Sequence, residues 1–178
     1  LSQIVVGGGF NCQSNRQGCV HSSLHSTISV LEGIHQYLTE GYNYRKQELS
    51  DVKATAEEFI LQHHLFRSDK TGNIIRPSFL KFHFPVRWYY DIFRALEYFA
   101  KSQKPFDNRM TESLQILHRL KTKEGVWKVA AHYPGKTHFI MEKAGQPSRW
   151  NTLRAIKIIR FYANSVSVIQ QNLFYAKT

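Results

Sequence analysis

The chain is poor in cysteine and in acidic residues, and it has no long apolar run. Two cysteines among 178 residues are too few for the disulfide framework of a small secreted domain. No apolar run approaches the ~20 residues of a membrane-spanning helix, so we expect no integral membrane span and a cytoplasmic location. Residues 1–4 lack the basic and apolar regions of a signal peptide and contain no Met. We therefore expect a fragment or a processed chain.

Basic residues outnumber acidic ones by 24 to 13, which gives a formal net charge of +11. Such a chain favours anionic partners: phosphate, diphosphate, acidic sugar, nucleic acid or anionic lipid. Because no helix-turn-helix, zinc-finger or RNA-recognition signature occurs, we expect no nucleic-acid partner. Hydrophobic residues make up 42% of the chain, enough for a core, and the length predicts a single domain over 1–178.

An internal repeat is the most informative feature of the sequence. The segments 30–34, 92–96 and 152–156 share an order of apolar or Thr, large apolar, charged, small and aliphatic residues. Their second positions are Leu31, Phe93 and Leu153, spaced by 62 and 60 residues. Each segment lies in a pattern of apolar residues at steps of three and four, which predicts helices over about 24–38, 89–99 and 153–162. The apolar stripes expected to face the core are Leu24, Ile28, Leu31, Ile34 and Leu38; Tyr89, Ile92, Phe93, Leu96 and Phe99; and Leu153, Ile156, Ile159 and Tyr162.

A second type of helix is predicted between the repeats, over about 56–65 and 110–120. Gly72 and Gly125 follow these helices and are expected to cap them in the left-handed conformation. Pro85 and Pro147 fit the first turns of the second and third repeat helices. No strand pattern is strong enough to build a sheet, so the prediction is an all-α fold of about five main helices. The tail, 163–178, has weak periodicity and no clear role.

Hairpins of about 60 residues with a Gly-aromatic turn resemble the α/α-toroid proteins. These include the terpenoid cyclases and the protein prenyltransferase β-subunits, and particularly bacterial proteins described as squalene-cyclase-like or prenyltransferase-like. The matching stretches are GGFNC at 8–12, HSSLHSTISVLEG at 21–33, RWYYD at 87–91 and PSRWNTLRA at 147–155. The resemblance implies an incomplete toroid, similar to a C-terminal half. A missing half or a homo-oligomer would then cover an exposed apolar face.

In such a toroid the starts of the repeat helices open into a central cavity. The resemblance therefore implies a ligand site, with arginines for an anionic head and aromatic rings for an apolar, isoprenoid-like tail. The alternative is that the aromatic residues fill the hub of the toroid and that Arg87 pairs with Asp91. The candidate ligand-binding residues are His83, Arg87, Trp88, Arg149, Trp150 and Asn151.

Asp91 is the best candidate for an acid or base, because burial beside aromatic residues raises a carboxyl pKa as a general acid requires. His21 and His25 are the other catalytic candidates, and they share a helix face if the helix has begun by His21. The Asp-rich acid motif of the cyclases is absent from this chain. A structural salt bridge is therefore the alternative role for Asp91.

Cys12, Cys19, His21 and His25 form the one weak metal pattern, since two thiolates and two imidazoles suit tetrahedral zinc. The spacing matches no common zinc finger, and we expect no metal or other cofactor. The alternative is a reduced loop in which Cys12 packs inside.

Three functions remain open from the sequence. The first is a squalene-cyclase-like or prenyltransferase-like domain of unknown reaction that binds an apolar molecule with an anionic head. The second is a non-catalytic binding or scaffold module with the same architecture. The third is a carbohydrate-active protein similar to the polysaccharide lyases, because a fold does not decide a function.

Overall fold

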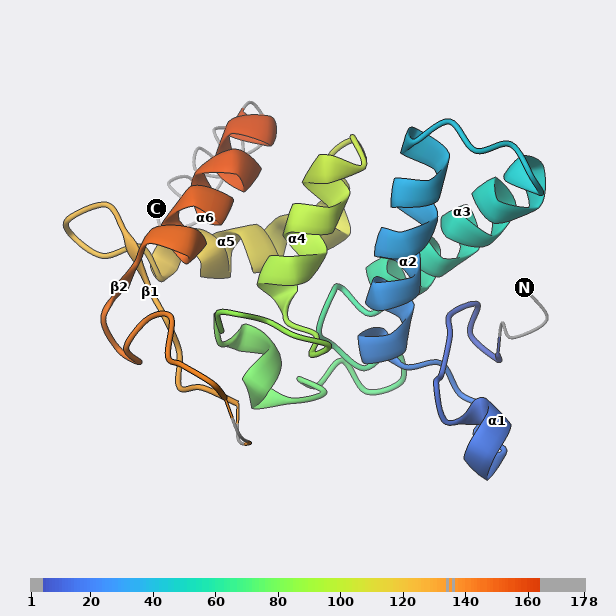
Figure 1. Ribbon diagram of the computed structural model, residues 1–178, viewed down its shortest axis with the longest axis horizontal. Helices are drawn as coiled ribbons and strands as arrows, with labels where there is room; N and C mark the ends of the chain where they lie inside the picture. Colours follow the sequence, from blue (N-terminus) through green and yellow to red (C-terminus); the bar gives the residue numbers. More distant parts are fainter. Residues whose placement is uncertain (1–4, 134, 136, 164–178) are drawn as a thin grey trace. The chain divides into compact units, whose positions relative to one another are not determined.

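The computed structural model describes residues 5–133, 135 and 137–163, and it is mostly helical (Figure 1). Five principal helices confirm the predicted number in these residues. No helix among the described residues is long and apolar enough to cross a membrane. The predicted tail lies outside the described residues from 164 onward. The five helices are α2 (Leu24–Thr39), α3 (Lys46–Gln62), α4 (Ile92–Lys101), α5 (Thr111–Arg119) and α6 (Arg149–Phe161).

The minor elements are short. They are the helix α1 (Ser14–Gln17), the 3₁₀ turns η1 (Pro77–Leu80) and η2 (Asn108–Met110), and the strands β1 (Trp127–Lys128) and β2 (Pro147–Ser148). The two strands pair antiparallel, with Trp127 opposite Ser148. Strand β1 lies in the largely apolar run 126–129, which is too short to predict a strand from the sequence alone.

The chain divides into two compact units. The first takes residues up to 75 together with 88–90, and the second takes 76–87 and the residues from 91 onward. The expectation of a single domain over 1–178 stays a prediction.

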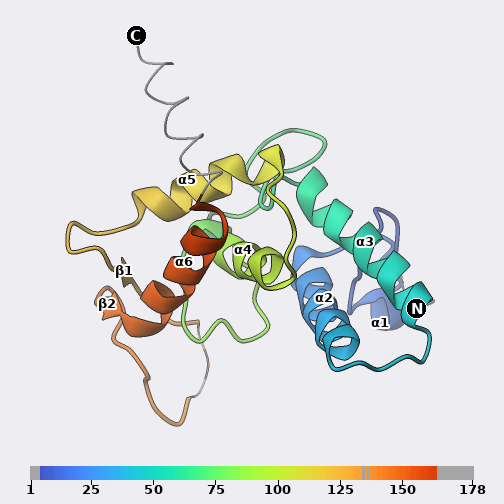
Figure 2. The same ribbon diagram turned by 90° about the horizontal axis from the view of Figure 1, so that it is seen from above.

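The first unit is built around the hairpin of α2 and α3, which pack along each other (Figure 2). Leu24, Ile28, Leu31 and Ile34 are buried on α2, as the periodicity predicts. The N-terminal segment lies close to this hairpin at Gly9. A Cβ atom there would come within 2.6 Å of the Thr27 hydroxyl oxygen, so the approach requires glycine.

The second unit is built around α4, which packs against both α5 and α6. Phe93, Leu96 and Phe99 of α4 are completely buried. Trp127 of β1 closes the core from the other side, and its indole N–H donates to the carbonyl of Leu117 at 2.8 Å. The short ladder thereby holds the start of α6 beside α5.

The expected helix boundaries need correction. Gly72 and Gly125 have positive φ angles of 69° and 83°, but both lie in turns beyond the helices. Helix α3 ends at Gln62 instead, and the left-handed residues that follow it are His64 and Leu65.

The two prolines do not lie in first turns. Pro85 precedes α4 by several residues, and Pro147 lies in β2. Local hydrogen bonding explains both starts, because Asp91 and Ser148 are the N-caps of α4 and α6 and each side chain accepts a backbone N–H. Asp91 thus fixes the start of α4 at Ile92 rather than at Tyr89.

The buried face of α6 also differs from the predicted one. Leu153 and Ile156 are exposed, whereas Asn151, Arg154 and Ile158 are buried. The reason is that Arg154 finds both an ion-pair partner and an aromatic ring inside the unit, so its burial is compensated.

Candidate functional site

Asp91 is completely buried at the start of α4. One carboxylate oxygen, Oδ1, accepts the backbone N–H of Arg94 at 2.7 Å, and Oδ2 has no hydrogen-bond partner among the described residues. Burial raises the pKa of this carboxyl to about 6. The charges of Arg154 and Arg94 and the hydrogen bond from the Arg94 backbone N–H oppose the rise, and the charge of Glu97 adds to it. The expected elevation of the pKa is therefore present, and its main cause is desolvation.

Arg154 of α6 lies close to this carboxyl, and its side chain interacts with other protein groups in a polar network. Its Nε donates to Glu97 at 2.7 Å, and its guanidinium lies over the Phe93 ring, 4.5 Å from the centroid. The side chain also contacts Asn151 Oδ1 at 3.4 Å. The network links α4 to α6, and this linking is a structural role.

Asn151 is buried and serves the backbone. Its amide donates to the carbonyls of Phe82 at 3.1 Å and of Lys128 at 3.3 Å. Its own N–H donates to the Ser148 hydroxyl at 2.9 Å. Asn151 therefore holds β1 and the segment before α4 against the start of α6, and its amide is occupied by protein partners.

His83 is buried in the second unit. Its Nδ1 lies 2.6 Å from the carbonyl oxygen of Ala131, and its ring lies 4.1 Å from that of Tyr133. The Nε2 atom is buried, and no residue in the described part of the chain forms a hydrogen bond with it. Desolvation lowers the pKa of His83, so the neutral imidazole is favoured.

The other predicted ligand-binding residues of this unit lie on its surface. Arg87 and Arg149 are exposed. Arg87 also precedes α4 and has a φ of 56°, so the predicted pairing with Asp91 one helical turn later does not form. Trp150 is half exposed and stacks on Phe84, with ring centroids 5.3 Å apart.

In the first unit, the structure brings together His25 and Trp88. The Nδ1 atom of His25 accepts the backbone N–H of Tyr90 at 2.8 Å, and the imidazole lies 5.5 Å from the Trp88 ring. His21 precedes α2 and pairs with Val6 in an extended bridge. The two histidines therefore do not share a helix face, because α2 begins only at Leu24.

The zinc pattern does not form a cluster. Among the described residues, no group of three or more His, Cys, Asp or Glu side chains could hold a metal ion. Cys12 is exposed rather than packed inside, and its backbone N–H donates to the Ser26 hydroxyl at 3.0 Å.

The predicted convergence of the candidate residues on one cavity spans both units and stays a prediction. Within the units, the structure joins His25 to Trp88, and it joins Asp91 to Asn151 through Arg154. The residues named for catalysis are thus placed among structural contacts.

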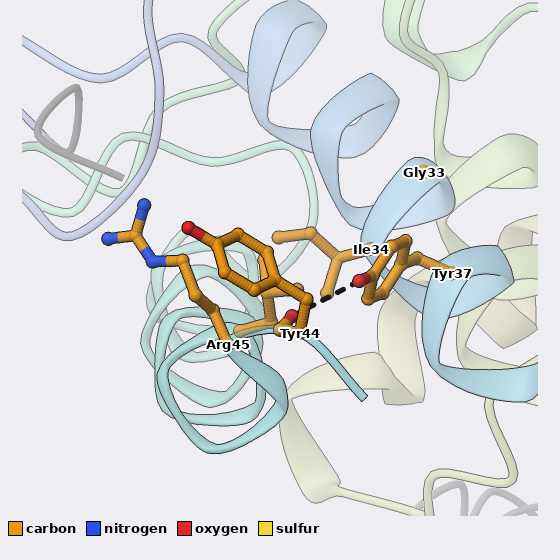
Figure 3. A pocket seen from close by; sticks show the side chains of 6 residues that line it. Gly33, Ile34, Tyr37, Tyr44 and Arg45 are labelled. Carbon is orange, nitrogen blue, oxygen red and sulfur yellow. Dashed lines mark hydrogen bonds between the residues drawn. The ribbon is translucent and has the colours of Figure 1, made fainter. Parts of the chain in front are cut away.

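A pocket of about 390 Å³ lies between α2 and α3 (Figure 3). Its walls are largely apolar, and its lining belongs entirely to the first unit. None of the lining residues is among the candidates predicted from the sequence, in which a glycine inside a helical pattern and a tyrosine-rich turn are the signals of this site. The lining residues are Gly33, Ile34, Tyr37, Tyr44, Arg45 and Leu49.

Local contacts hold the Tyr37 side of the aromatic wall of this pocket. The Tyr37 hydroxyl donates to the Tyr44 carbonyl at 3.1 Å, which joins α2 to the turn before α3 (Figure 3). The Tyr37 ring also stacks on Tyr42, with centroids 5.0 Å apart. These contacts pre-organise the Tyr37 side for a ligand, whereas the Tyr44 side chain is 79% exposed.

Two backbone features shape the opening. Gly33 lies inside α2, and a Cβ atom added there would meet nothing within 4 Å. Arg45 has a left-handed backbone, with φ of 55°, at the N-cap of α3. Its guanidinium makes a two-pronged ion pair with Glu48, at 2.6 Å and 2.5 Å, and Figure 3 shows it on the side of the Tyr44 ring that faces away from Tyr37.

Comparison with family models, curated proteins and solved structures gives no match. The resemblance to the α/α-toroid proteins therefore stays a hypothesis, and the function has to be argued from the residues themselves.

Proposed function

We propose that the chain is a non-catalytic binding module for a small, largely apolar molecule that carries an anionic group. The pocket between α2 and α3 is its site. The observation that carries the proposal is an apolar pocket with a tyrosine wall, held on its Tyr37 side, and an arginine at its edge. The ligand chemistry is the one expected from the sequence, and the location is different.

The size and the walls of the pocket fit such a ligand. About 390 Å³ lies within the roughly 300–1,000 Å³ typical of small-molecule sites. Ile34, Leu49 and the ring faces of Tyr37 and Tyr44 offer apolar surface. Removing that surface from water favours binding by roughly 25 cal/mol per Å².

Arg45 supplies the polar end of the site. Its ion pair with Glu48 is half exposed on both sides, and exposed pairs contribute little net stability. A carboxylate, sulfonate or phosphate on the ligand can therefore share or replace Glu48 on the planar guanidinium, which binds such groups with two hydrogen bonds.

A role without catalysis agrees with the contacts of the candidate residues. Asp91 caps α4, Asn151 holds backbone carbonyls, and His25 accepts a backbone N–H. None of these side chains lines the pocket.

The α/α-toroid architecture is also part of the proposal. It is supported by the packing of two repeat helices, α4 and α6, against each other and of α5 against α4.

A cyclase-like enzyme is the second candidate, and one observation favours it. The pKa of Asp91 is raised to about 6, near the value that a general acid needs at neutral pH. This candidate requires substrate to reach a fully buried carboxyl. If Asp91→Asn abolished turnover of an isoprenoid substrate while the helical circular dichroism was retained, the result would favour the enzyme over the binding module as the function of the chain.

The binding proposal is tested with two fluorescent probes of similar shape. Anilinonaphthalene sulfonate carries an anionic group, and N-phenylnaphthylamine carries no charge. We expect both to bind, because both fill the apolar pocket. Gly33→Leu should abolish binding of both, since the new side chain extends into open space at the pocket. Arg45→Gln should weaken only the sulfonate.

The control is Ala54→Leu, which places the same side chain at an exposed position on α3 that does not line the pocket. It should leave both titrations unchanged. Equal loss in the two leucine variants, or unchanged binding in Gly33→Leu with intact circular dichroism, would contradict the proposed site.

A further inference from the structure

We propose that the solvent-facing side of α6 and the loop before it dock on an anionic lipid surface. This inference concerns the second unit and is independent of the pocket between α2 and α3. The lipid-docking face, as we name it, comprises six α6 side chains and the loop residues 139–141. The six are Arg149, Trp150, Leu153, Ile156, Lys157 and Arg160.

The first observation is the composition of the exposed side of α6. Successive helical residues are about 100° apart, so these six side chains fall within an arc of about 120°. Trp150, Leu153 and Ile156 are each 44–46% exposed. The other three residues are cationic, and α6 contains no Asp or Glu. A helix with this mixture of apolar and basic residues is typical of membrane surfaces.

The second observation is the loop. Phe139, Ile140 and Met141 are consecutive and 72%, 68% and 45% exposed. Three large apolar side chains in a row on a loop bury little surface in the protein itself, and such exposed groups mark interaction sites. Lys143 follows them and is also exposed.

Glu142 joins the loop to the helix. Its carboxylate accepts the backbone N–H of Arg149 at 2.8 Å and the hydroxyl hydrogen of Ser148. These contacts direct the negative charge to the start of α6, where the helix dipole favours it. The apolar loop residues are thereby tethered to the helix, and Figures 1 and 2 show the chain passing from the loop through β2 into α6.

The chemistry of this face favours lipid over other occupants. Most apolar groups of the face are aliphatic, and aliphatic side chains do not stack on bases as a nucleic-acid site requires. Of its two aromatic rings, Trp150 already stacks on Phe84, which leaves Phe139. The cations Arg149, Lys157 and Arg160 repel the same face of a second copy. In a membrane, anionic headgroups attract these cations, and Trp150 suits the interface between headgroups and acyl chains. The aliphatic side chains can insert at the edge of the acyl region.

The experiment is co-sedimentation of the protein with two kinds of vesicle. One is phosphatidylcholine alone, and the other contains about 30 mol% phosphatidylglycerol, which gives the surface negative charge. We expect binding to the anionic vesicles, weaker binding to the neutral ones, and a loss with rising salt. Lys157→Glu with Arg160→Glu should weaken the anionic binding by about tenfold or more.

The apolar part is tested separately. Leu153→Ser with Ile156→Ser, and a triple serine variant of 139–141, should each reduce binding to both vesicles. The matched controls are Lys70→Glu with Lys123→Glu and Ile74→Ser with Ile75→Ser, all at exposed positions outside the lipid-docking face. The controls should bind as the unchanged protein does, and circular dichroism should be the same for all variants.

Three results overturn the inference. The first is that the unchanged protein does not bind anionic vesicles. The second is that the face variants and the control variants lose binding equally. The third is that light scattering detects an oligomer and that the α6 variants are monomeric, which would assign the face to a second copy.

Discussion

The Asp91 network and the α2–α3 pocket differ in almost every respect. The network contains titratable and polar residues, the kind that a sequence analysis selects as catalytic candidates. Each of its described contacts links segments of the fold to one another. The pocket holds apolar and aromatic residues with ordinary chemistry and leaves space between them. A buried polar group needs partners, which the fold supplies by using it as a connector. Open space is instead left where side chains are small or absent.

The strongest test of this comparison removes a connector from the network. Arg154→Ala deletes the ion pair with Glu97 and the contact with the Phe93 ring. We expect the free energy of unfolding to fall by about 3 kcal/mol, the lower end for a broken buried pair, because Glu97 is partly exposed. Chemical denaturation measures it, and a loss below 1 kcal/mol would show that the network is not a connector. Probe binding in the pocket should not change below the unfolding transition.

The second test uses pH, because burial raises the pKa of Asp91 to about 6 from 3.8. Between these values the folded state binds more protons at Asp91 than the unfolded state. The contribution of Asp91 to stability is therefore fully present below pH 4 and is lost as pH rises through about 6. Its size is on the order of 3 kcal/mol, since the shift is about two pKa units and one unit corresponds to about 1.4 kcal/mol.

Asp91→Asn isolates this contribution, because asparagine keeps the capping oxygen without titrating. The difference between the unchanged and variant unfolding free energies should change over the window between pH 4 and 6. The lowered pKa of His83 acts in the opposite direction, since a histidine kept neutral makes the folded state less stable as pH falls. The contribution of His83 is the same in both proteins, so it cancels when their unfolding free energies are subtracted. A difference that stays constant between pH 4 and 6 would contradict the raised pKa of Asp91.

The smallest effect is expected at the pocket. Gly33→Ala replaces a helical glycine whose Cβ would meet no atom within 4 Å. We expect a gain in unfolding free energy of about 0.5–1 kcal/mol, because alanine loses less backbone entropy in a helix. Thermal unfolding measures the gain. A destabilised variant would show that the space beside Gly33 is not open.

The sequence predicts the placement of the helices well, because burial imposes a period. The stripe of Leu24, Ile28, Leu31 and Ile34 on α2 is confirmed, since every third or fourth residue faces the same core. The stripe on α6 was wrong, because periodicity counts only apolar residues. The buried Arg154 is compensated by partners on another helix, and that pairing is not visible along one segment.

The candidate site was less predictable for a related reason. The start of α4 depends on the hydrogen bond between the Asp91 carboxylate and the Arg94 N–H, which overrides the apolar pattern beginning at Tyr89. The pocket depends on a missing side chain at Gly33 and on a left-handed backbone at Arg45. Neither leaves a periodic signal, so both require the three-dimensional structure.

The segment Trp88–Tyr90 belongs to the first unit although residues 76–87, which precede it, belong to the second. The Tyr90 hydroxyl donates to the Leu65 carbonyl, and its backbone N–H reaches His25. During synthesis, the first unit cannot make these contacts until Tyr90 has left the ribosome, and by then part of the second unit has been made as well. A single cut in the chain cannot separate the two units with all their residues. Expression of residues 1–75 alone would leave the carbonyl of Leu65 and the imidazole of His25 without the partners that Tyr90 supplies.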